Sequence, residues 1–361
     1  MARESDDVTA VLRTSAPTYK DIARITGLSL ATISKHFNGG SVREPNRVAI
    51  EDAVDRLGYR VNEAARSLRT RRSRAVGVYL PELGGDFHFA VIAGVESALR
   101  EDGAGVIVSS GGTGPDGEHP LDALLSRQVD AVIAVPGPQD GAALARVVAT
   151  GTPLVLVDRL VDGVDVDAVV LDNQRAAVQA VQHLLDLGHT RVGLVCGPRE
   201  VWTMRERLMG YRAALGAAHL PTDDRDIEAV PLTVEDGRSA ARRILDRPDR
   251  PSAIVCVNER LVLGALVAAR ELGFSVPQDL SVVGFDGPEV ALAMNPPLTV
   301  VVQPTATIAE RAARLLHARF VDPTATTRPQ IFVMPSTLVP GGSTGVPKPD
   351  REKIPRVQHP I

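Results

Sequence analysis

The sequence holds only two cysteines and no long apolar run, and both absences narrow what the chain can be. Cys196 and Cys256 each lie in an apolar, β-forming stretch, which favours buried free thiols over a disulfide, a metal site or a nucleophile. No run of about eighteen apolar residues occurs, so no membrane-spanning helix is expected. The first seventeen residues are polar and lack the apolar segment of a secretory signal. These absences predict a cytoplasmic protein.

Motifs of the common nucleotide-binding and hydrolytic enzymes are also missing. The glycine-rich segment 111–117 lacks the spacing of a dinucleotide-binding loop, and neither a P-loop nor a nucleophile elbow occurs. The histidines are scattered without cysteines at metal-binding spacing, and His189 is expected to hydrogen-bond near a helix end. We therefore expect no catalysis, no metal and no cofactor. Because α/β sheets carry many activities, an enzymatic or purely ligand-binding protein remains the alternative.

The charge is unevenly distributed along a chain that is too long for one core. At 361 residues, two or more domains are expected. Residues 1–74 hold 14 Lys and Arg against 9 Asp and Glu, whereas the remainder holds 26 against 35. Many of the early basic residues lie in the run RSLRTRRSR at 66–74. This distribution predicts a small anion-binding module joined to an acidic body.

The basic module begins with signals for a short helix and a tight turn. Thr18 and Asp21 form the pattern of a capping box, so a helix is expected to begin at Tyr19. Gly27 permits the sharp turn that ends it. Three residues are expected to form its apolar side: Ile22, Ala23 and Ile25.

A second helix is predicted from Leu30 to Phe37, with Ser29 as its N-cap. Ile33 and Phe37 lie four residues apart and are expected to face the core. The outward residues are then Leu30, Ala31, Ser34 and Lys35. A third helix is indicated by Ile50, Ala53, Val54 and Leu57, with Gly58 as its stop.

Two short helices joined by a tight glycine turn are typical of a helix-turn-helix. The outward side of the second helix would then face the DNA major groove, with its hydroxyls near phosphates and its first turn near base edges. The alternative is a small structural bundle followed by a solvated linker. In the following segment, Asn62 is placed to cap a short helix in which Leu68 stands alone among arginines. With no core to join, Leu68 is suited to insert into a base step from the minor groove.

The runs TYKDIARITGLSLATISKHFN and RLGYRVNEAARSL resemble the headpiece and hinge of the lactose/galactose repressor (LacI/GalR) family, and the resemblance continues to about residue 340. It implies a DNA-binding set consisting of Tyr19, Ser29, Leu30, Ala31, Thr32, Ser34, Lys35, His36, Asn38, Asn62, Ala65 and Leu68. Lys35 stands where the family more often has arginine, and a lysine reads guanine less rigidly than a planar guanidinium does.

The rest of the chain alternates apolar β-forming runs with helical segments, in an order that repeats twice. The runs are AVGVYL, GVIVSS, DAVIAVPG, PLVLVD and AVVLDN, then RVGLVCG, EAVPL, AIVCVN and SVVGFD. Continuous apolar strands separated by helices predict parallel sheets covered on both faces. We expect an α/β fold of two doubly wound lobes, with a ligand in the cleft at the carboxyl ends of the strands. The family resemblance implies the same bilobed, periplasmic-binding-protein-like body.

Polar residues that follow the strands are the candidates for a ligand site. Asp158, Asn258 and Asp286 each end an apolar run, Arg207 lies beyond a fourth run, and Phe87 offers an apolar platform. Such groups suit bidentate hydrogen bonds to sugar hydroxyls. By position alone, each of these residues is about as suited to capping a helix or a loop as to contacting a ligand. The resemblance favours the ligand role, because all five coincide with effector-binding positions of the family.

Several residues near these positions depart from the family pattern. Glu259 follows Asn258, and Gly287 follows Asp286, where the family has aspartates. Before the first helix of the body the usual Asn-Pro is missing, and Asp86 or His88 would reshape that wall. Trp202, the only tryptophan, is open to two interpretations: stacking on a sugar or packing on the lobe surface.

Together these observations predict a dimeric transcriptional regulator, a repressor controlled by a small ligand, with a sugar or a sugar derivative as the expected effector. It would bind a near-palindromic operator, since one headpiece reads only a half-site. The expected segments are an unstructured 1–17, a DNA-binding domain at 18–61, a hinge at 62–74, an effector-binding and dimerisation body at 75–340, and an unstructured 341–361. The last segment has no leucine heptads, so a coiled-coil tetramer is not expected.

Overall fold

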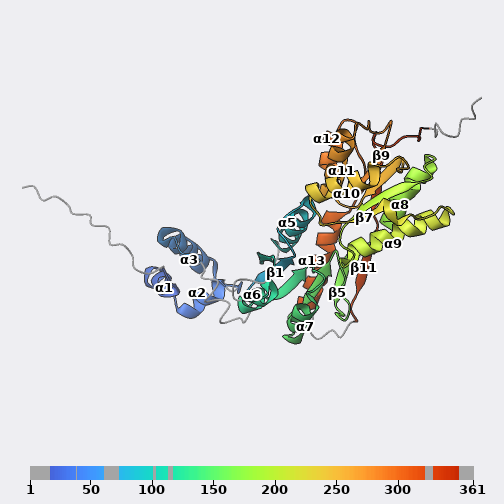
Figure 1. Cartoon of the computed structure of the whole chain (residues 1–361). Helices are drawn as coiled ribbons and strands as arrows, with labels where there is room; N and C mark the ends of the chain where they lie inside the picture. The colour runs from blue at the N-terminus through green and yellow to red at the C-terminus, as the bar shows by residue number, and fades with distance from the viewer. Residues whose placement is uncertain are drawn as a thin grey trace, which may run out of the picture. The chain divides into compact units, whose positions relative to one another are not determined.

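A computed structural model describes residues 17–37, 39–60, 73–100, 103–112, 117–321 and 328–348. The chain divides into two compact units between Ser73 and Arg74, and each unit is described by itself (Figure 1). The short helix expected after Asn62, within the predicted hinge at 62–74, falls on residues that lie outside the described ones.

The described residues of the first unit form three helices: α1 (Tyr19–Thr26), α2 (Leu30–Phe37) and α3 (Glu44–Leu57) (Figure 1). The predicted capping box of α1 is present, with both the Thr18 and Asp21 side chains bonded to the opposite backbone. Gly27 and Gly58 end α1 and α3 in the left-handed conformation, with φ of 69° and 60°, which glycine adopts without strain. The helix-turn-helix predicted from these signals is confirmed.

A small apolar core joins the three helices. Ile22, Ile33 and Ile50 are fully buried and come from α1, α2 and α3 respectively. Tyr19 stacks on Phe37 with ring centroids 5.1 Å apart, which closes one side of this core. The expectation for Ile25 is wrong. Its side chain is 41% exposed, because it lies three residues after Ile22 on the rim of a narrow buried stripe.

In the second unit the described residues form two six-stranded sheets. The first has the order β11-β5-β4-β3-β1-β2, and all of its pairs are parallel. Its strands are β1 (Ala75–Leu80), β2 (Gly105–Ser110), β3 (Ala131–Ala134), β4 (Leu154–Val157), β5 (Asp167–Leu171) and β11 (Ile331–Met334). One face packs against α5 (Asp86–Arg100) and α13 (Thr305–Val321), and the other against α6 (Pro120–Ser126) and α7 (Gly141–Ala149).

The second sheet has the order β12-β10-β9-β8-β6-β7. Its strands are β6 (Val192–Cys196), β7 (Ile227–Ala229), β8 (Ala253–Cys256), β9 (Ser281–Phe285), β10 (Thr299–Val302) and β12 (Thr337–Val339). Helices α8 (Asn173–Asp186) and α9 (Trp202–Ala217) cover one face, and α10 (Val234–Leu245) and α11 (Glu259–Glu271) cover the other. A short 3-10 helix (Asp224–Asp226) precedes β7, and α12 (Pro288–Ala293) follows β9. The predicted pair of doubly wound lobes is confirmed.

The lobes are not consecutive halves of the chain, which the sequence reading did not anticipate. The chain passes between them three times: from β5 to α8, from β10 to α13, and from β11 to β12. Three strands, β10, β11 and β12, were missed, and β12 runs antiparallel to β10. The segments TVVV of β10 and IFVM of β11 are β-forming runs like those of the strands that were found. On β11 exposed and half-buried residues alternate, because it lies at the edge of its sheet.

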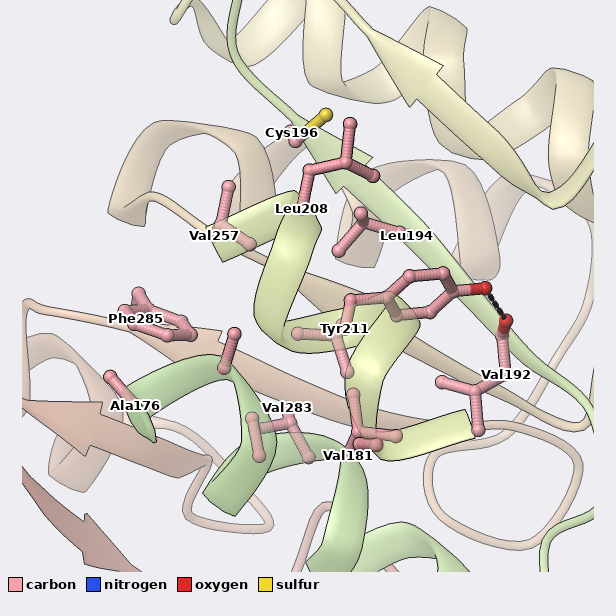
Figure 2. Close-up of a cluster of buried hydrophobic side chains, with 14 of the residues drawn as sticks. Ala176, Val181, Val192, Leu194, Cys196, Leu208, Tyr211, Val257, Val283 and Phe285 are labelled. Atoms are coloured by element: carbon pink, nitrogen blue, oxygen red, sulfur yellow. Dashed lines mark hydrogen bonds between the residues drawn. The ribbon is translucent and has the colours of Figure 1, made fainter. Parts of the chain in front are cut away.

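The core of the second lobe lies between its sheet and α8 and α9, as Figure 2 shows. Tyr211 is almost fully buried, and its hydroxyl donates to the carbonyl oxygen of Val192 (2.7 Å) (Figure 2). Cys196 and Cys256 are buried free thiols, as predicted. Burial raises the pKa of Cys196 to about 11, so neither its position nor its ionisation suits a nucleophile.

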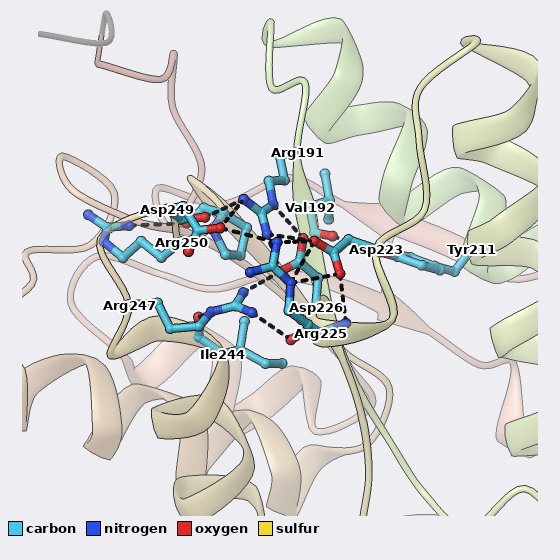
Figure 3. Close-up of polar contacts among 11 residues, drawn as sticks. Arg191, Val192, Tyr211, Asp223, Arg225, Asp226, Ile244, Arg247, Asp249 and Arg250 are labelled. Carbon is cyan, nitrogen blue, oxygen red and sulfur yellow. Dashed lines mark hydrogen bonds and ion pairs between the residues drawn. The ribbon is translucent and has the colours of Figure 1, made fainter. Parts of the chain in front are cut away.

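A network of charged residues lies at the amino end of β6, in the second sheet (Figure 3). Arg191 pairs with Asp226 (2.6 Å) and Asp223 (3.2 Å), and Arg247 also bonds Asp226. Asp226 is buried, and two guanidiniums compensate its charge. The network ties the edge strand β7 to the sheet, and it lies at the end remote from the strand carboxyl ends.

The expectation of an unstructured chain after residue 340 is wrong for residues 341–348. Ser343 is buried: its hydroxyl accepts from the Thr299 N–H (2.8 Å), and its carbonyl accepts from the Val282 N–H (2.9 Å). His189 hydrogen-bonds with Gly345 O (2.9 Å) and Ser252 Oγ (2.8 Å), in agreement with the hydrogen-bonding role expected for it. Small residues in this segment allow the backbone to run close against the sheet, and composition alone did not reveal that packing. Among the described residues no helix has the length and apolarity to cross a membrane.

Candidate functional site

The first turn of α2 presents small side chains at the surface of the headpiece. The Thr32 N–H donates to Ser29 Oγ (3.2 Å), so Ser29 caps the helix as predicted. The two hydroxyls also bond each other (2.9 Å). Leu30 is 46% exposed and Ala31 is exposed. This turn therefore offers one apolar side chain and two hydroxyls to whatever approaches it.

Lys35 continues the same exposed surface, one turn further along α2. The side chain is exposed, and its stem passes so close to Gly40 that a Cβ there would lie 2.6 Å from Lys35 Cγ. Ser34 and His36 are half-buried. Tyr19 belongs mainly to the aromatic stack with Phe37, so most of its ring serves the core. The remaining members of the predicted set, Asn38, Asn62, Ala65 and Leu68, lie outside the described residues.

A cleft of about 450 Å³ lies between the two lobes of the second unit. It opens at the carboxyl ends of the parallel strands, where ligands of such sheets bind. The structure brings together here all five residues that were predicted to bind an effector: Phe87, Asp158, Arg207, Asn258 and Asp286. Phe87 and Asp158 come from the first lobe and the other three from the second, so the cleft needs both lobes.

Asp158 and Asp286 occupy equivalent places in the two lobes. Each directly follows its strand, β4 or β9, and donates its N–H to the next strand, at Val169 O (3.0 Å) and Val301 O (2.9 Å) respectively. Each then turns into the left-handed region, with φ of 70° and 62°. Aspartate tolerates this conformation better than most residues, and such strain is typical of functional sites. Two carboxylates are thereby fixed on opposite walls of the cleft.

Arg207 is buried on the inner side of α9. Its Nε donates to Asn173 Oδ1 (2.8 Å) and its Nη1 to Val257 O (2.6 Å), and the guanidinium lies 4.5 Å from the centroid of Phe285. Burial lowers the pKa of Arg207, while Asp286 and Asp158 act to raise it. Gly210 lets α9 come this close to α8, because any other residue would place a Cβ only 2.2 Å from Gln174 O.

Asn258 both caps a helix and lines the cleft. The Oδ1 atom of Asn258 accepts from the Arg260 N–H (2.9 Å) as the N-cap of α11, which is the capping role left open by the sequence. Its amide nitrogen makes no hydrogen bond to described residues, so it is available to a ligand in the cleft that it lines. Phe87 is half-buried against the core of the first lobe.

Sequence reasoning missed Gln303, which directly follows β10 and lines the cleft. Its Nε2 donates to both carboxylate oxygens of Asp286 (2.9 and 3.0 Å), and its buried Oε1 has no partner among the described residues. The rule that found Asp286, a polar residue directly after an apolar run, would also have found Gln303 in TVVVQ.

Arg159 was missed as well. It bonds Asp158 Oδ2 (3.0 Å) and Pro136 O (3.2 Å).

Glu259, which lines the cleft, lies against Gly287, and both are departures from the family pattern. A Cβ at Gly287 would lie 2.8 Å from Glu259 Cγ, so the glycine leaves room for the longer acid. Burial raises the pKa of Glu259, and the carboxylates of Asp86 and Asp286 raise it further. Burial likewise raises the pKa of Asp286, against the lowering effects of Arg207 and Gln303. The cleft thus favours a ligand rich in hydrogen-bond donors.

Comparison with known proteins connects this geometry to a family. Residues 181–344 match the model of a periplasmic binding protein-like domain. The catabolite control protein A of Priestia megaterium is 32% identical over 302 residues, which cover 83% of this chain and 91% of that protein. The chain belongs to the LacI family of transcriptional regulators.

Solved structures agree with the placement of the chain in the LacI family. A complex of the transcriptional regulator CelR with cellobiose is 31% identical, with a TM-score of 0.70, and covers 91% of this chain and 99% of that one. The Lac repressor dimer bound to operator and an anti-inducer is 26% identical, with a TM-score of 0.81, and covers 92% and 100%. This LacI-family regulator is accordingly a DNA-binding protein under the control of a small ligand.

Proposed function

We propose that this regulator is a homodimeric repressor that binds a near-palindromic operator and responds to a neutral sugar, or a sugar derivative, held between the lobes of its body. The observation that carries the proposal is the interlobe cleft, where Asp158, Arg207, Asn258 and Asp286 converge beside the ring of Phe87. Carboxylates, a guanidinium and an amide around an aromatic ring suit a polyhydroxylated ligand.

The DNA-binding half of the proposal rests on α2. Its exposed first turn and Lys35 fit the major groove, where hydroxyls reach phosphates and the turn meets base edges. One such helix reads one half-site, so a near-palindromic operator requires two copies of the chain. The Lac repressor with which this chain shares its fold is a dimer on its operator. Acting on DNA, the regulator would work in the cytoplasm, by binding rather than by catalysis.

The connections between the lobes suggest how the ligand controls DNA binding. Asn173 accepts a hydrogen bond from Arg207 and is the first residue of α8, directly after the first crossing. Gln303 donates to Asp286 and lies in the second crossing, between β10 and α13. A ligand that engages Arg207 and Asp286 therefore acts directly on the segments about which the lobes move. The short helix expected at 62–69, within the hinge at 62–74, is too short to be stable alone, so its folding on DNA would depend on how the bodies of the two copies sit.

Fluorescence anisotropy tests this function. The purified protein is titrated with DNA from its own upstream region at two salt concentrations, with and without a panel of sugars. We expect tight, salt-sensitive binding to one near-palindromic site, weakened about 5- to 150-fold by one sugar. Binding that a sugar strengthens would keep the regulator but make the sugar a corepressor. Absence of specific binding under every condition would favour the ligand-binding or enzymatic alternative.

A further inference from the structure

The interlobe cleft continues beyond the effector residues into a second chamber. This chamber has a volume of about 330 Å³ and shares Gly137, Pro138, Arg159 and Val201 with the first. None of the five predicted effector residues lines it. The shared residues form a neck, and Arg159 is held there by its bonds to Asp158 and Pro136.

Trp202, the only tryptophan of the chain, lines this second chamber and not the first. It is the first residue of α9, five positions before Arg207, and its ring is partly exposed. No aromatic or cationic group of the described residues stacks on it, and its indole N–H donates to none of their atoms. A large ring with an open face and a free donor at a cleft wall is suited to the face of a sugar ring.

The polar residues around Trp202 also lack partners. The side chains of Gln139, Asp162, Glu200 and Arg205 line the chamber and make no hydrogen bond or ion pair with the described residues. Asp162 and Gln139 come from the first lobe, whereas Glu200 and Arg205 come from the second. With Arg159 included, two cations face two carboxylates, so the chamber is balanced in charge, unlike the acidic first chamber. A neutral polyhydroxylated group matches such a wall.

We propose that the second chamber is a binding subsite for a further sugar unit, so that the effector is a neutral sugar of at least two units. One unit occupies the chamber of Asp158, Arg207 and Asp286, the linkage passes the neck at Arg159, and the second unit stacks on Trp202. This inference rests on the proposed sugar-responsive function and names the size class of its ligand. A two-unit ligand contacts both lobes twice, which strengthens its hold on their relative position.

The single tryptophan provides a direct test on the intact protein. Matched one- and two-unit sugars (glucose with cellobiose and maltose, galactose with lactose and melibiose, xylose with xylobiose) are titrated by calorimetry and by tryptophan fluorescence. We expect a two-unit sugar to bind more tightly than its one-unit partner and to shift the Trp202 emission, which the one-unit sugar leaves unchanged.

Two variants of α9 separate the subsite from general damage to the helix. Trp202→Ala is expected to weaken binding of the two-unit sugar by roughly 3- to 10-fold and to leave the one-unit affinity within about twofold. Met209→Ala is the control, since Met209 is 49% exposed on the same helix and lines neither chamber. It should bind both sugars as the wild type does.

The outcomes distinguish this proposal from the proposed function. If a one-unit sugar binds and alters operator affinity while no two-unit sugar binds, the second subsite is refuted and the sugar-responsive regulator stands. Equal losses for both sugars in Trp202→Ala, or no loss for either, would also refute the subsite. If no sugar of either size binds, the sugar-responsive function fails, and the subsite fails with it.

Discussion

Arg207 shows how a single buried side chain is prepared for a ligand. Its two hydrogen bonds, to Asn173 and to Val257 O, use two of its nitrogens in fixed directions, and Phe285 supports the guanidinium from one side. The remaining donors are left for the cleft that it lines. A buried cation between Asp158 and Asp286 also keeps these two carboxylates from repelling each other across the cleft.

Replacing Arg207 with lysine should keep the positive charge and abolish the hydrogen-bond geometry of the guanidinium. A lysine ammonium cannot bond Asn173 and Val257 and still present a planar pair of donors to a ligand. We expect Arg207→Lys to lose roughly 10- to 100-fold in effector affinity, measured by calorimetry, because charge-assisted hydrogen bonds are lost. Arg212→Lys, on the same helix but in an exposed pair with Asp224, is the control and should bind as the wild type. Equal affinities for both variants would contradict the role of Arg207.

The raised pKa of Glu259 predicts a stability effect that depends on pH. Because burial and the neighbouring carboxylates favour its protonated form in the folded state, Glu259 costs stability once it ionises. Glu259→Gln should therefore raise the melting temperature most at pH 7. The gain should shrink as pH falls through the raised pKa of Glu259 toward the ordinary value of a glutamate. Thermal melts from pH 4 to 7.5 measure this gain, and a gain independent of pH would disprove the assignment.

At the scale of single elements, the sequence predicted what local signals encode. Thr18, Asp21 and Gly27 mark the ends of α1, and the apolar runs of β1 to β9 mark strands. Most of these strands are buried on both faces, whereas the edge strands β2 and β7 are only partly buried. Strand β11 also contains an apolar run, IFVM, and could have been found in this way, although as an edge strand its residues are half-buried or exposed. The sequence could not show that residues 341–348 pack against β9 and β10, since that depends on small residues meeting a surface formed much earlier in the chain.

The contact between α8 and α9 depends on one glycine. A Cβ at Gly210 would lie 2.2 Å from Gln174 O and 2.9 Å from Ala177 Cβ, so Gly210→Ala must push the helices apart. We expect a loss of about 1 to 3 kcal/mol in the free energy of unfolding. Gly216→Ala is the control on the same helix. Apart from its own helix, no atom of the described residues lies within 4 Å of its added Cβ, and the higher helix propensity of alanine should stabilise the protein by about 0.5 to 1 kcal/mol. Urea denaturation measures both, and similar stabilities would contradict the close approach.

At the scale of the whole molecule, the chain crosses three times between the two lobes that form the cleft. These crossings were invisible in the sequence, where the body reads as two consecutive repeats. The five effector positions were predicted, partly from strand ends and partly from family resemblance, and all five line one cleft. Asn173 and Gln303, which hold Arg207 and Asp286 beside the crossings, were not predicted. Gln303 directly follows the apolar run of β10 and could have been found by its position, whereas the bond of Asn173 to Arg207 arises only from tertiary contacts.

Gln303→Leu tests whether the second crossing transmits the effect of the ligand. The leucine removes both hydrogen bonds to Asp286 and leaves the headpiece unchanged. Without sugar, the variant should bind the operator with an affinity within about twofold of the wild type. Added sugar should change the operator affinity of the variant less than that of the wild type, for which a typical coupling free energy is about 1 to 3 kcal/mol. Anisotropy titrations with saturating sugar measure the coupling. A full response in the variant would show that Gln303 plays no part in it.

The most direct test of the account compares operator binding of the wild type and Arg207→Lys, each titrated with and without the sugar that binds the cleft. The account predicts that both proteins bind the operator equally without sugar. At a sugar concentration that just saturates the wild type, the operator affinity of the wild type should change by about 5- to 150-fold, and that of Arg207→Lys, which binds the sugar more weakly, should change less. The account would be contradicted if the wild type bound the operator identically with and without bound sugar, because the interlobe cleft would then have no control over DNA binding.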